Sequence, residues 1–211
     1  MLKIGLTGNY LSGYTDIADL FEEKGIKVFD ADVVLRFMTN YSIEHTKKIS
    51  SILGPKAYIG GVVDSNFFDS KDKFDKLLDC LQVDLIKAYE KWRIKNYNSI
   101  YTIFKCSILF ERSLDKHMNF NISVYRPKME RRRDMAYETA LSNLKIEKIL
   151  DNEMDELNKN LKSNFIIHNY NSGGSYSDNQ ENLKDQIHNI HRALIKKGST
   201  NSDASIKNIM L

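Results

Sequence analysis

Residues 8–15, Gly-Asn-Tyr-Leu-Ser-Gly-Tyr-Thr, come close to a loop that binds nucleotide phosphates. Such a loop reads GxxxxGK[ST]: its glycines let backbone N–H groups point at the phosphates, its lysine reaches the β- and γ-phosphates, and its hydroxyl binds Mg²⁺. The lysine position holds Tyr14. A glycine-rich turn of this kind also occurs in α/β proteins that bind no phosphate. The motif predicts nucleotide contacts from Gly8, Ser12, Gly13, Tyr14 and Thr15, the last also a Mg²⁺ ligand.

Two carboxylates, Asp30 and Asp32, follow the loop, and Arg36 stands one helical turn further on. A positioned carboxylate can accept the proton of a hydroxyl that attacks a phosphate. The same residue types also cap helices, because a carboxylate accepts hydrogen bonds from the N–H groups of a first helical turn. Without further context, the capping interpretation is favoured.

The elements around these residues follow from hydrophobic spacing. Residues 2–7 read as a buried strand, residues 15–24 carry apolar side chains at helical spacing, and residues 26–29 read as a second strand. Gly25 ends the helix between them, as glycine commonly does. Strand, loop, helix and strand in this order form the βαβ unit of a parallel sheet.

The rest of the chain continues the alternation. We expect a helix at 72–97, two charged helices within 126–162, and strands at 99–104, 120–125 and 164–168. This order predicts an α/β fold, a parallel sheet with flanking helices. The predicted organisation is a domain over 1–169, a polar linker over 170–182, and a C-terminal helix with a frayed tail over 183–211.

Composition narrows the class of protein. The chain has 211 residues, enough for one globular domain, and a net charge of +3, too small to indicate nucleic acid by itself. Cys80 and Cys106 are its two cysteines, which excludes a disulfide framework. There is no signal-peptide pattern and no apolar run of membrane-spanning length, so we expect a cytoplasmic protein that binds no membrane.

Together, these residues resemble the dephospho-CoA kinase family. Its members begin with a stretch like IGLTGGIGSGKST and continue with DAD and then an arginine. The matching residues here, in the same order and spacing, are residues 4–8 (Ile-Gly-Leu-Thr-Gly), Ser12-Gly13, Asp30-Ala31-Asp32 and Arg36. Residues 108–111 resemble the family's PLLFE, and residues 149–153 with 162–169 resemble its ILxxQ…ADxVIxN. The resemblance spans residues 4–169.

The resemblance implies a P-loop kinase fold with a helical insert at about 66–98 and a lid at about 126–150. It implies ATP and Mg²⁺ as cofactors and phosphorylation of the ribose 3′-hydroxyl of dephospho-CoA. In that family a carboxylate of the DAD segment is the base, which assigns catalysis to Asp30 and Asp32 and substrate binding to Arg36. It also assigns ATP phosphate contacts to the lid arginines Arg131 and Arg132.

The basic cluster of the lid region has other interpretations. The cluster could bind an anion, nucleic acid or an acidic partner, or form a solvated helix face whose charges pair internally. Glu130 and the acidic residues 151–156 favour internal pairing. The members are Arg126, Lys128, Arg131, Arg132 and Arg133.

The departures from the family fall on the chemistry. Tyr14 cannot supply positive charge, Asn9 and Leu11 replace loop glycines, and Lys105 stands where the family has aspartate. The sequence therefore predicts a degenerate phosphate loop with activity lost or altered. Lys105 either pairs with a DAD carboxylate, the favoured and silent version, or replaces the missing lysine charge. The alternative to a kinase is a pseudokinase scaffold or accessory subunit, of the kind a compact viral genome could encode, that docks a protein partner.

Overall fold

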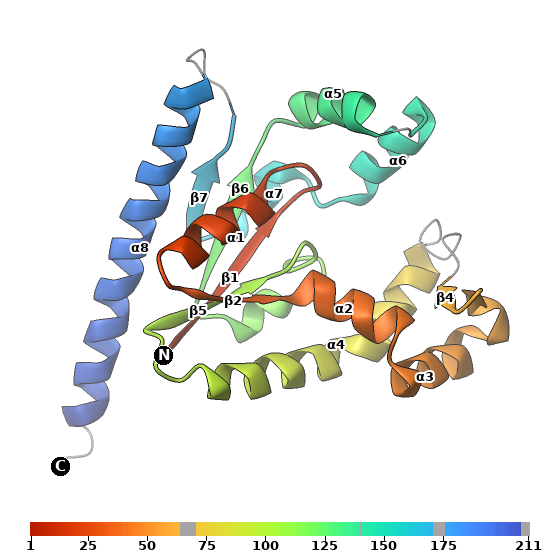
Figure 1. Ribbon diagram of the computed structural model, residues 1–211, viewed down its shortest axis with the longest axis horizontal. Helices are drawn as coiled ribbons and strands as arrows, with labels where there is room; N and C mark the ends of the chain where they lie inside the picture. The colour runs from red at the N-terminus through yellow and green to blue at the C-terminus, as the bar shows by residue number, and fades with distance from the viewer. Residues whose placement is uncertain (64–70, 140, 171–175, 208–211) are drawn as a thin grey trace. The chain divides into compact units, whose positions relative to one another are not determined.

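A computed structural model describes all residues except 64–70, 140, 171–175 and 208–211. Its main sheet has five strands in the order β2-β5-β1-β6-β7, and the pairs β1–β5, β1–β6 and β6–β7 run parallel (Figure 1). The strands are β1 (Leu2–Gly8), β2 (Lys27–Asp30), β5 (Tyr101–Lys105), β6 (Phe120–Tyr125) and β7 (Phe165–His168). The expected α/β fold, with a parallel sheet and flanking helices, is confirmed.

The chain divides into two compact units. The sheet unit comprises Met1–Phe29 and Tyr97–Leu211, and the helical unit comprises Asp30–Asn96. Most of the insert at about 66–98 expected from the sequence falls within the helical unit, and the insert stays a prediction. Residues 66–70 of that insert lie outside the described residues.

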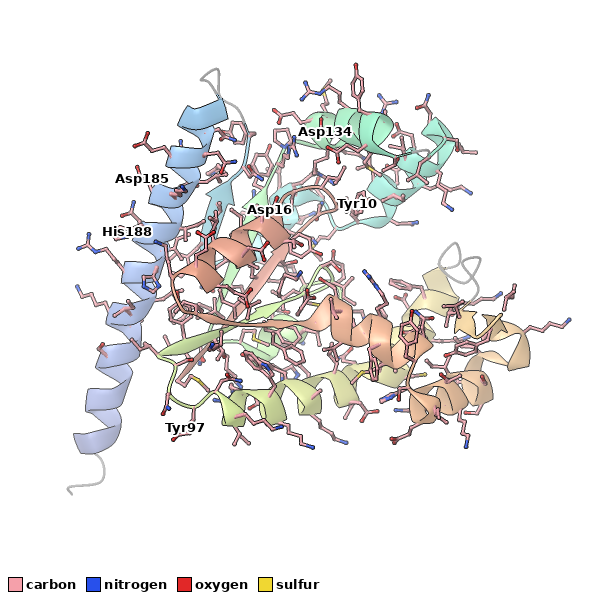
Figure 2. The ribbon with its side chains drawn as sticks, in the orientation of Figure 1. Tyr10, Asp16, Tyr97, Asp134, Asp185 and His188 are labelled. Carbon is pink, nitrogen blue, oxygen red and sulfur yellow. The ribbon has the colours of Figure 1, made fainter. Side chains whose placement is uncertain are left out.

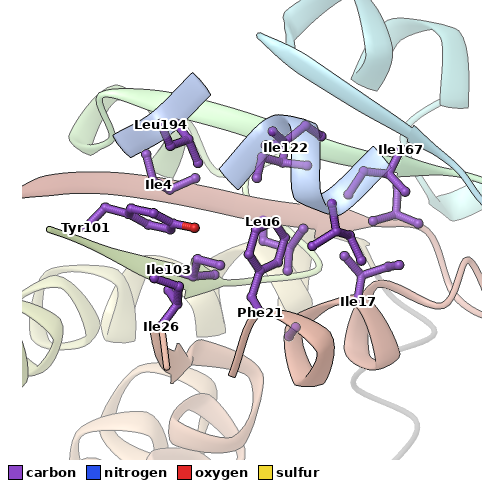
Figure 3. Packing of buried hydrophobic residues seen from close by; sticks show 14 of the residues in the cluster. Ile4, Leu6, Ile17, Phe21, Ile26, Tyr101, Ile103, Ile122, Ile167 and Leu194 are labelled. Carbon is purple, nitrogen blue, oxygen red and sulfur yellow. The ribbon is translucent and has the colours of Figure 1, made fainter. Parts of the chain in front are cut away.

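One face of the sheet carries the main core. Leu2, Ile4 and Leu6 alternate along β1, so they share one face, and all are buried. Helices α1 (Tyr14–Glu23) and α8 (Tyr176–Lys207) bring their apolar side chains onto this face (Figures 1 and 3). This core holds the end of β1 and the start of α1 in place, and the loop between them is the candidate phosphate loop.

Close packing on the opposite face requires a glycine. A side chain at Gly5 would lie 2.6 Å from Leu109 Cδ2 and would also collide with Asn121. The glycine at position 5 of the family-like stretch is thus required by the packing of β1.

The lid region holds three helices where the sequence predicted two. They are α5 (Lys128–Glu138), α6 (Asn143–Asn152) and α7 (Glu156–Lys162), with a 3₁₀ helix, η3 (Leu114–His117), earlier in the chain. Ser142 caps α6 by accepting from the N–H of Lys145, and Asp155 caps α7 by accepting from Leu157 and Asn158. These caps each start a helix, so residues 126–162 form three helices, whereas the charge pattern of that stretch predicted two.

The C-terminal helix is longer than expected at both ends. Helix α8 begins at Tyr176, inside the expected linker, and continues to Lys207, through residues expected to fray. Residues 171–175 of that linker lie outside the described residues. At Gly198 the helix lies close to Ile100, just before β5, because a side chain there would lie 2.8 Å from Ile100 Cγ2. Glycine has no side chain and so permits this close approach.

The helical unit has its own small core. It contains α2 (Ala31–Asn40), α3 (Ile43–Leu53), the 3₁₀ helix η1 (Pro55–Ala57), the short strands β3 (Tyr58–Ile59) and β4 (Val62–Val63), and α4 (Lys71–Lys95). The strands β3 and β4 form an antiparallel pair. The buried core residues are Met38, Ile49, Leu77, Cys80 and Leu81. Within the described residues, no helix is long and apolar enough to cross a membrane.

Candidate phosphate-binding site

The loop between β1 and α1 has the backbone that a phosphate loop needs. Gly13, immediately before α1, has φ of 84°, and a side chain there would collide with the Asn169 amide. A side chain at Gly8 would collide with Ser12. Both signature glycines are therefore required by geometry. The loop leads into the N-terminus of α1, where backbone N–H groups and the helix dipole favour an anion.

Leu11, at a position where the family has glycine, also adopts the left-handed conformation, with φ of 57°. That conformation costs a non-glycine residue roughly 1–2 kcal/mol. The side chain packs against the lid core of Met135, Ile146 and Leu150, and this burial offsets the cost. Leucine is thus accommodated because its side chain has an apolar place among the lid helices.

Arg131 of α5 is buried and fastens the loop to the lid (Figure 2 labels Tyr10 in the loop). Its guanidinium donates to the Tyr10 carbonyl at 2.9 Å, to Glu153 at 2.8 Å and to Glu156 at 2.5 Å. Glu153 in turn accepts from the Tyr10 N–H at 2.5 Å. Arg126 adds a second tie, from its Nη1 to the Leu11 carbonyl at 3.2 Å. The loop is therefore shaped by side chains from the lid region.

The other members of the basic cluster pair with nearby acidic residues, as the sequence suggested. Arg126 pairs with Asp134, which Figure 2 labels on α5, and Lys128 lies 3.1 Å from Asp151. Arg132 lies 2.5 Å from Glu147. These ion pairs support the internal-pairing interpretation of the cluster.

Lys105 places a positive charge beside the loop. It is the last residue of β5 and is only 6% exposed. Its Nζ lies 3.4 Å from Thr15 Oγ1 and 5.7 Å from the centre of the Tyr14 ring. Thr15, expected to bind Mg²⁺, and Tyr14, which occupies the lysine position of the motif, therefore both lie next to this ammonium.

Comparison with known proteins places this arrangement in a family. The sequence model of dephospho-CoA kinase matches residues 2–174. The chain belongs to the dephospho-CoA kinase family. The dephospho-CoA kinases of Rickettsia felis and Rickettsia bellii are each 26% identical to it, over 92% and 90% of this chain and 100% and 98% of their own length.

Solved structures support the fold of a dephospho-CoA kinase. A crystal structure from Thermus thermophilus superposes with a TM-score of 0.71 at 19% identity, covering 93% of this chain and 97% of that one. The dephospho-CoA kinase from Campylobacter jejuni superposes with a TM-score of 0.53 at 18% identity, covering 91% and 96%. A shikimate kinase from Bacteroides thetaiotaomicron reaches 0.51 at 9% identity, covering 92% and 98%. The P-loop kinase fold is thus confirmed.

In this chain the DAD segment, residues 30–32, lies at the end of β2 and the start of α2. Asp30 caps α2, its Oδ1 accepting from the Val33 N–H at 3.0 Å, and Asp32 lies in the first turn. The capping interpretation therefore holds for Asp30. The catalytic role of both carboxylates and the substrate role of Arg36, which is exposed on α2, stay predictions.

The two lid arginines assigned to ATP differ in their surroundings. Arg131 is 1% exposed, and its guanidinium is engaged by the loop and two glutamates. Arg132 is exposed and lines a hollow of about 530 Å³ between α5 and α6. A phosphate contact stays a prediction for both, and Arg132 has the more accessible position for it.

Sequence reasoning assigned no role to three residues that shape the loop. Asn169 follows β7, and its Nδ2 donates to the Ser12 carbonyl at 2.8 Å. Asn9 Nδ2 donates to the Met154 carbonyl at 2.9 Å, and Glu153 binds Tyr10 as described. The position of Asn169 directly after a strand was a usable signal, because ligand sites lie at the carboxyl ends of parallel strands.

Proposed function

We propose that this protein transfers the γ-phosphoryl group of ATP to the ribose 3′-hydroxyl of dephospho-CoA. The observation that carries the proposal is the phosphate loop itself. Its glycine backbone, the N-terminus of α1, the Thr15 hydroxyl and the Lys105 ammonium converge within the sheet unit of a dephospho-CoA kinase relative. Positioning and charge neutralisation supply most of the catalysis in phosphoryl transfer.

In the proposed reaction, the 3′-oxygen attacks the γ-phosphorus while the bond to the β-phosphate oxygen breaks and ADP leaves. The proton of the 3′-hydroxyl passes to a carboxylate of the DAD segment, Asp30 or Asp32. Backbone N–H groups of the loop and the start of α1 stabilise the charge on the phosphates. Arg36 and Arg132 are proposed to bind the substrate and the nucleotide, respectively.

The residues around Thr15 fit phosphate oxygens better than a free Mg²⁺ ion. Magnesium is usually held by carboxylates together with substrate phosphates. Thr15 offers a hydroxyl, but the Lys105 ammonium lies 3.4 Å from that oxygen and repels a divalent cation. Among the residues that the structure describes, no group of three or more His, Cys, Asp or Glu side chains gathers that could hold a metal ion. In the proposal, any Mg²⁺ is brought by ATP, where it neutralises phosphate charge.

The direct test is formation of coenzyme A from dephospho-CoA and ATP, followed by chromatography with mass detection. Turnover that requires both substrates is expected from the purified chain. Asp30→Asn and Asp32→Asn should each be compared with Asp72→Asn, which changes an exposed aspartate that is ion-paired with Lys76. Asparagine caps helices about as well as aspartate, so Asp30→Asn removes the candidate base while keeping the cap.

The proposal fails if the wild-type chain forms no coenzyme A under conditions in which a relative does. The scaffold alternative predicts that result, together with an unchanged melting temperature in millimolar ATP and dephospho-CoA. A ligand that binds only the folded state must raise the melting temperature by mass action. The comparisons favour the kinase family and give no support to the scaffold role.

A further inference from the structure

Three successive carbonyls of the phosphate loop each accept a hydrogen bond from a side chain outside the loop. The bonds run from Arg131 to the Tyr10 carbonyl at 2.9 Å, from Arg126 to the Leu11 carbonyl at 3.2 Å, and from Asn169 to the Ser12 carbonyl at 2.8 Å. Arg126 stands between β6 and α5, Arg131 lies on α5, and Asn169 follows β7. These three side chains are the carbonyl donors of the loop, and they come from two separate stretches of the chain.

The carbonyl donors determine where the neighbouring N–H groups point. All peptides here are trans, so the C=O of one residue and the N–H of the next point in opposite directions. The three held peptides carry the N–H groups of Leu11, Ser12 and Gly13, which therefore point away from the donors. The Ser12 N–H donates to the Asn9 carbonyl at 2.9 Å. Among the residues that the structure describes, the N–H groups of Leu11 and Gly13 have no hydrogen-bond partner.

The two arginines act on the loop through geometry more than through charge. Their guanidinium groups are already paired with carboxylates, which are Glu153 at 2.8 Å and Glu156 at 2.5 Å for Arg131, and Asp134 for Arg126. A paired cation attracts a further anion weakly, because its partner's field opposes its own. The third donor, Asn169, is neutral. What the carbonyl donors have in common is therefore the direction that they impose on the peptides of the loop.

That direction matters for an anion. A carbonyl oxygen turned toward a phosphate repels it, whereas an N–H group attracts it. The backbone carries a larger share of the binding in this loop than in a loop with the motif's lysine, because Tyr14 has no positive charge. Any side chain that keeps the carbonyls on the outer side therefore favours binding without touching the ligand.

We propose that Arg126, Arg131 and Asn169 are positioning residues for phosphate binding. They hold three carbonyls away from the ligand and so present the N–H groups of Leu11 and Gly13 to it. For Arg131 this role differs from the direct phosphate contact that the family resemblance implies. The inference rests on the proposed function in that the ligand is a di- or triphosphate at this loop.

The test measures binding of inorganic diphosphate and of ADP by calorimetry in EDTA, so that no metal ion contributes, with coenzyme A formation in parallel. Asn169→Leu removes the amide donor and keeps a neutral side chain of similar shape. It should weaken both ligands about 3- to 10-fold, the effect of one hydrogen bond. Arg126→Met tests the same role at a second carbonyl and should give a loss of about the same size.

Amide NMR spectra of isotope-labelled protein supply a readout that a merely structural role would not change. In the wild type, saturating diphosphate should move the amide proton resonances of Leu11 and Gly13 to lower field, because these groups become hydrogen-bond donors. In Asn169→Leu the shift of Gly13 should be smaller, because the peptide between Ser12 and Gly13 has lost the donor that holds it.

Two variants of the helical unit are matched controls. Asn96→Leu removes an equivalent bond, from an asparagine amide to the Trp92 carbonyl at 2.9 Å. Arg93→Met removes an arginine with the same 25% exposure as Arg126, paired with Glu90 at 2.7 Å. Neither side chain donates to the loop, so both controls should keep diphosphate affinity within about twofold of wild type.

Two results overturn the inference: folded Asn169→Leu and Arg126→Met bind diphosphate as tightly as their controls, or the Leu11 and Gly13 resonances of the wild type do not respond to saturating diphosphate. A wild-type chain that makes coenzyme A, with ADP affinity unchanged in both variants, refutes the inference and leaves the proposed function standing. Diphosphate binding that depends on both donors, without any coenzyme A formed, supports the inference and refutes the proposed reaction. A wild-type chain that neither binds diphosphate nor turns over refutes both.

Discussion

Replacing Arg131 with methionine removes a buried guanidinium that holds the loop and lid together. Arg131 is 1% exposed, and the side chains of its partners Glu153 and Glu156 are 16% and 14% exposed. The variant leaves two mostly buried carboxylates without their cation and the Tyr10 carbonyl without its donor. Removing one partner of a buried ion pair costs about 3–5 kcal/mol. For a chain of this size, that lowers the melting temperature by about 6–20 °C.

The measurement is urea unfolding followed by circular dichroism, supported by thermal melts. Arg132→Met is the matched control, because Arg132 lies on the same helix and is also paired, but is 58% exposed. An exposed ion pair contributes only about 0.2–1 kcal/mol. The reasoning is refuted if the two variants lose equal stability, or if Arg131→Met loses less than about 1 kcal/mol.

A compensated variant checks that charge burial is the cause. Changing Glu153 and Glu156 to glutamine together with Arg131→Met removes the uncompensated charge, and a glutamine at 153 can still accept from the Tyr10 N–H. Replacing every member of a buried charged group is often close to neutral. The triple variant should therefore be more stable than Arg131→Met alone.

Three further predictions concern local features. Gly13→Ala should lose more stability than Gly25→Ala in urea unfolding and should also lose ADP affinity. Both glycines have positive φ, but of the two only Gly13 lies where a side chain would meet another residue, Asn169. Asp30→Ala should lower stability by about 1 kcal/mol relative to Asp30→Asn through loss of the helix cap, measured by the same unfolding. Burial, helped by nearby positive charge, lowers the pKa of His191 in the folded chain. The unfolded chain therefore binds more protons, and the free energy of unfolding falls as the pH drops through about 6.5. His191→Gln should make the melting temperature depend less on pH between about 7.5 and 5.5, and an equally steep profile would contradict this.

The elements of the sheet unit were predictable because their signals are local. Alternation of apolar residues along β1, the glycine spacing of the loop and the helical spacing of α1 each lie within a few neighbouring residues. The strand at Phe120–Tyr125 was predicted with the bounds that the structure shows. Such patterns report the face that each element buries, and burial decides the fold.

The interactions that shape the site were not predictable in the same way. The basic cluster has five members, and nothing in their order shows that Arg131, rather than its neighbours, is buried against Glu153 and Glu156. Asn9, in the loop, bonds to the Met154 carbonyl 145 residues away along the chain, and Asn169 bonds to the Ser12 carbonyl of the loop 157 residues away. The length of helix α8 was underestimated because Gly198 and the polar residues before Leu183 are typical of loops in sequence, although the helix runs from Tyr176 to Lys207.

The ties from Arg126 and Arg131 also determine how the loop behaves in time. Side chains of the lid region donate hydrogen bonds to the carbonyls of Tyr10 and Leu11, so opening the loop away from that region breaks these bonds. Amide hydrogens of the loop and of α5 should therefore exchange with solvent in a single cooperative opening. Exchange of the loop amides well before those of α5 would show that the hydrogen bonds of Arg126 and Arg131 do not couple the two segments.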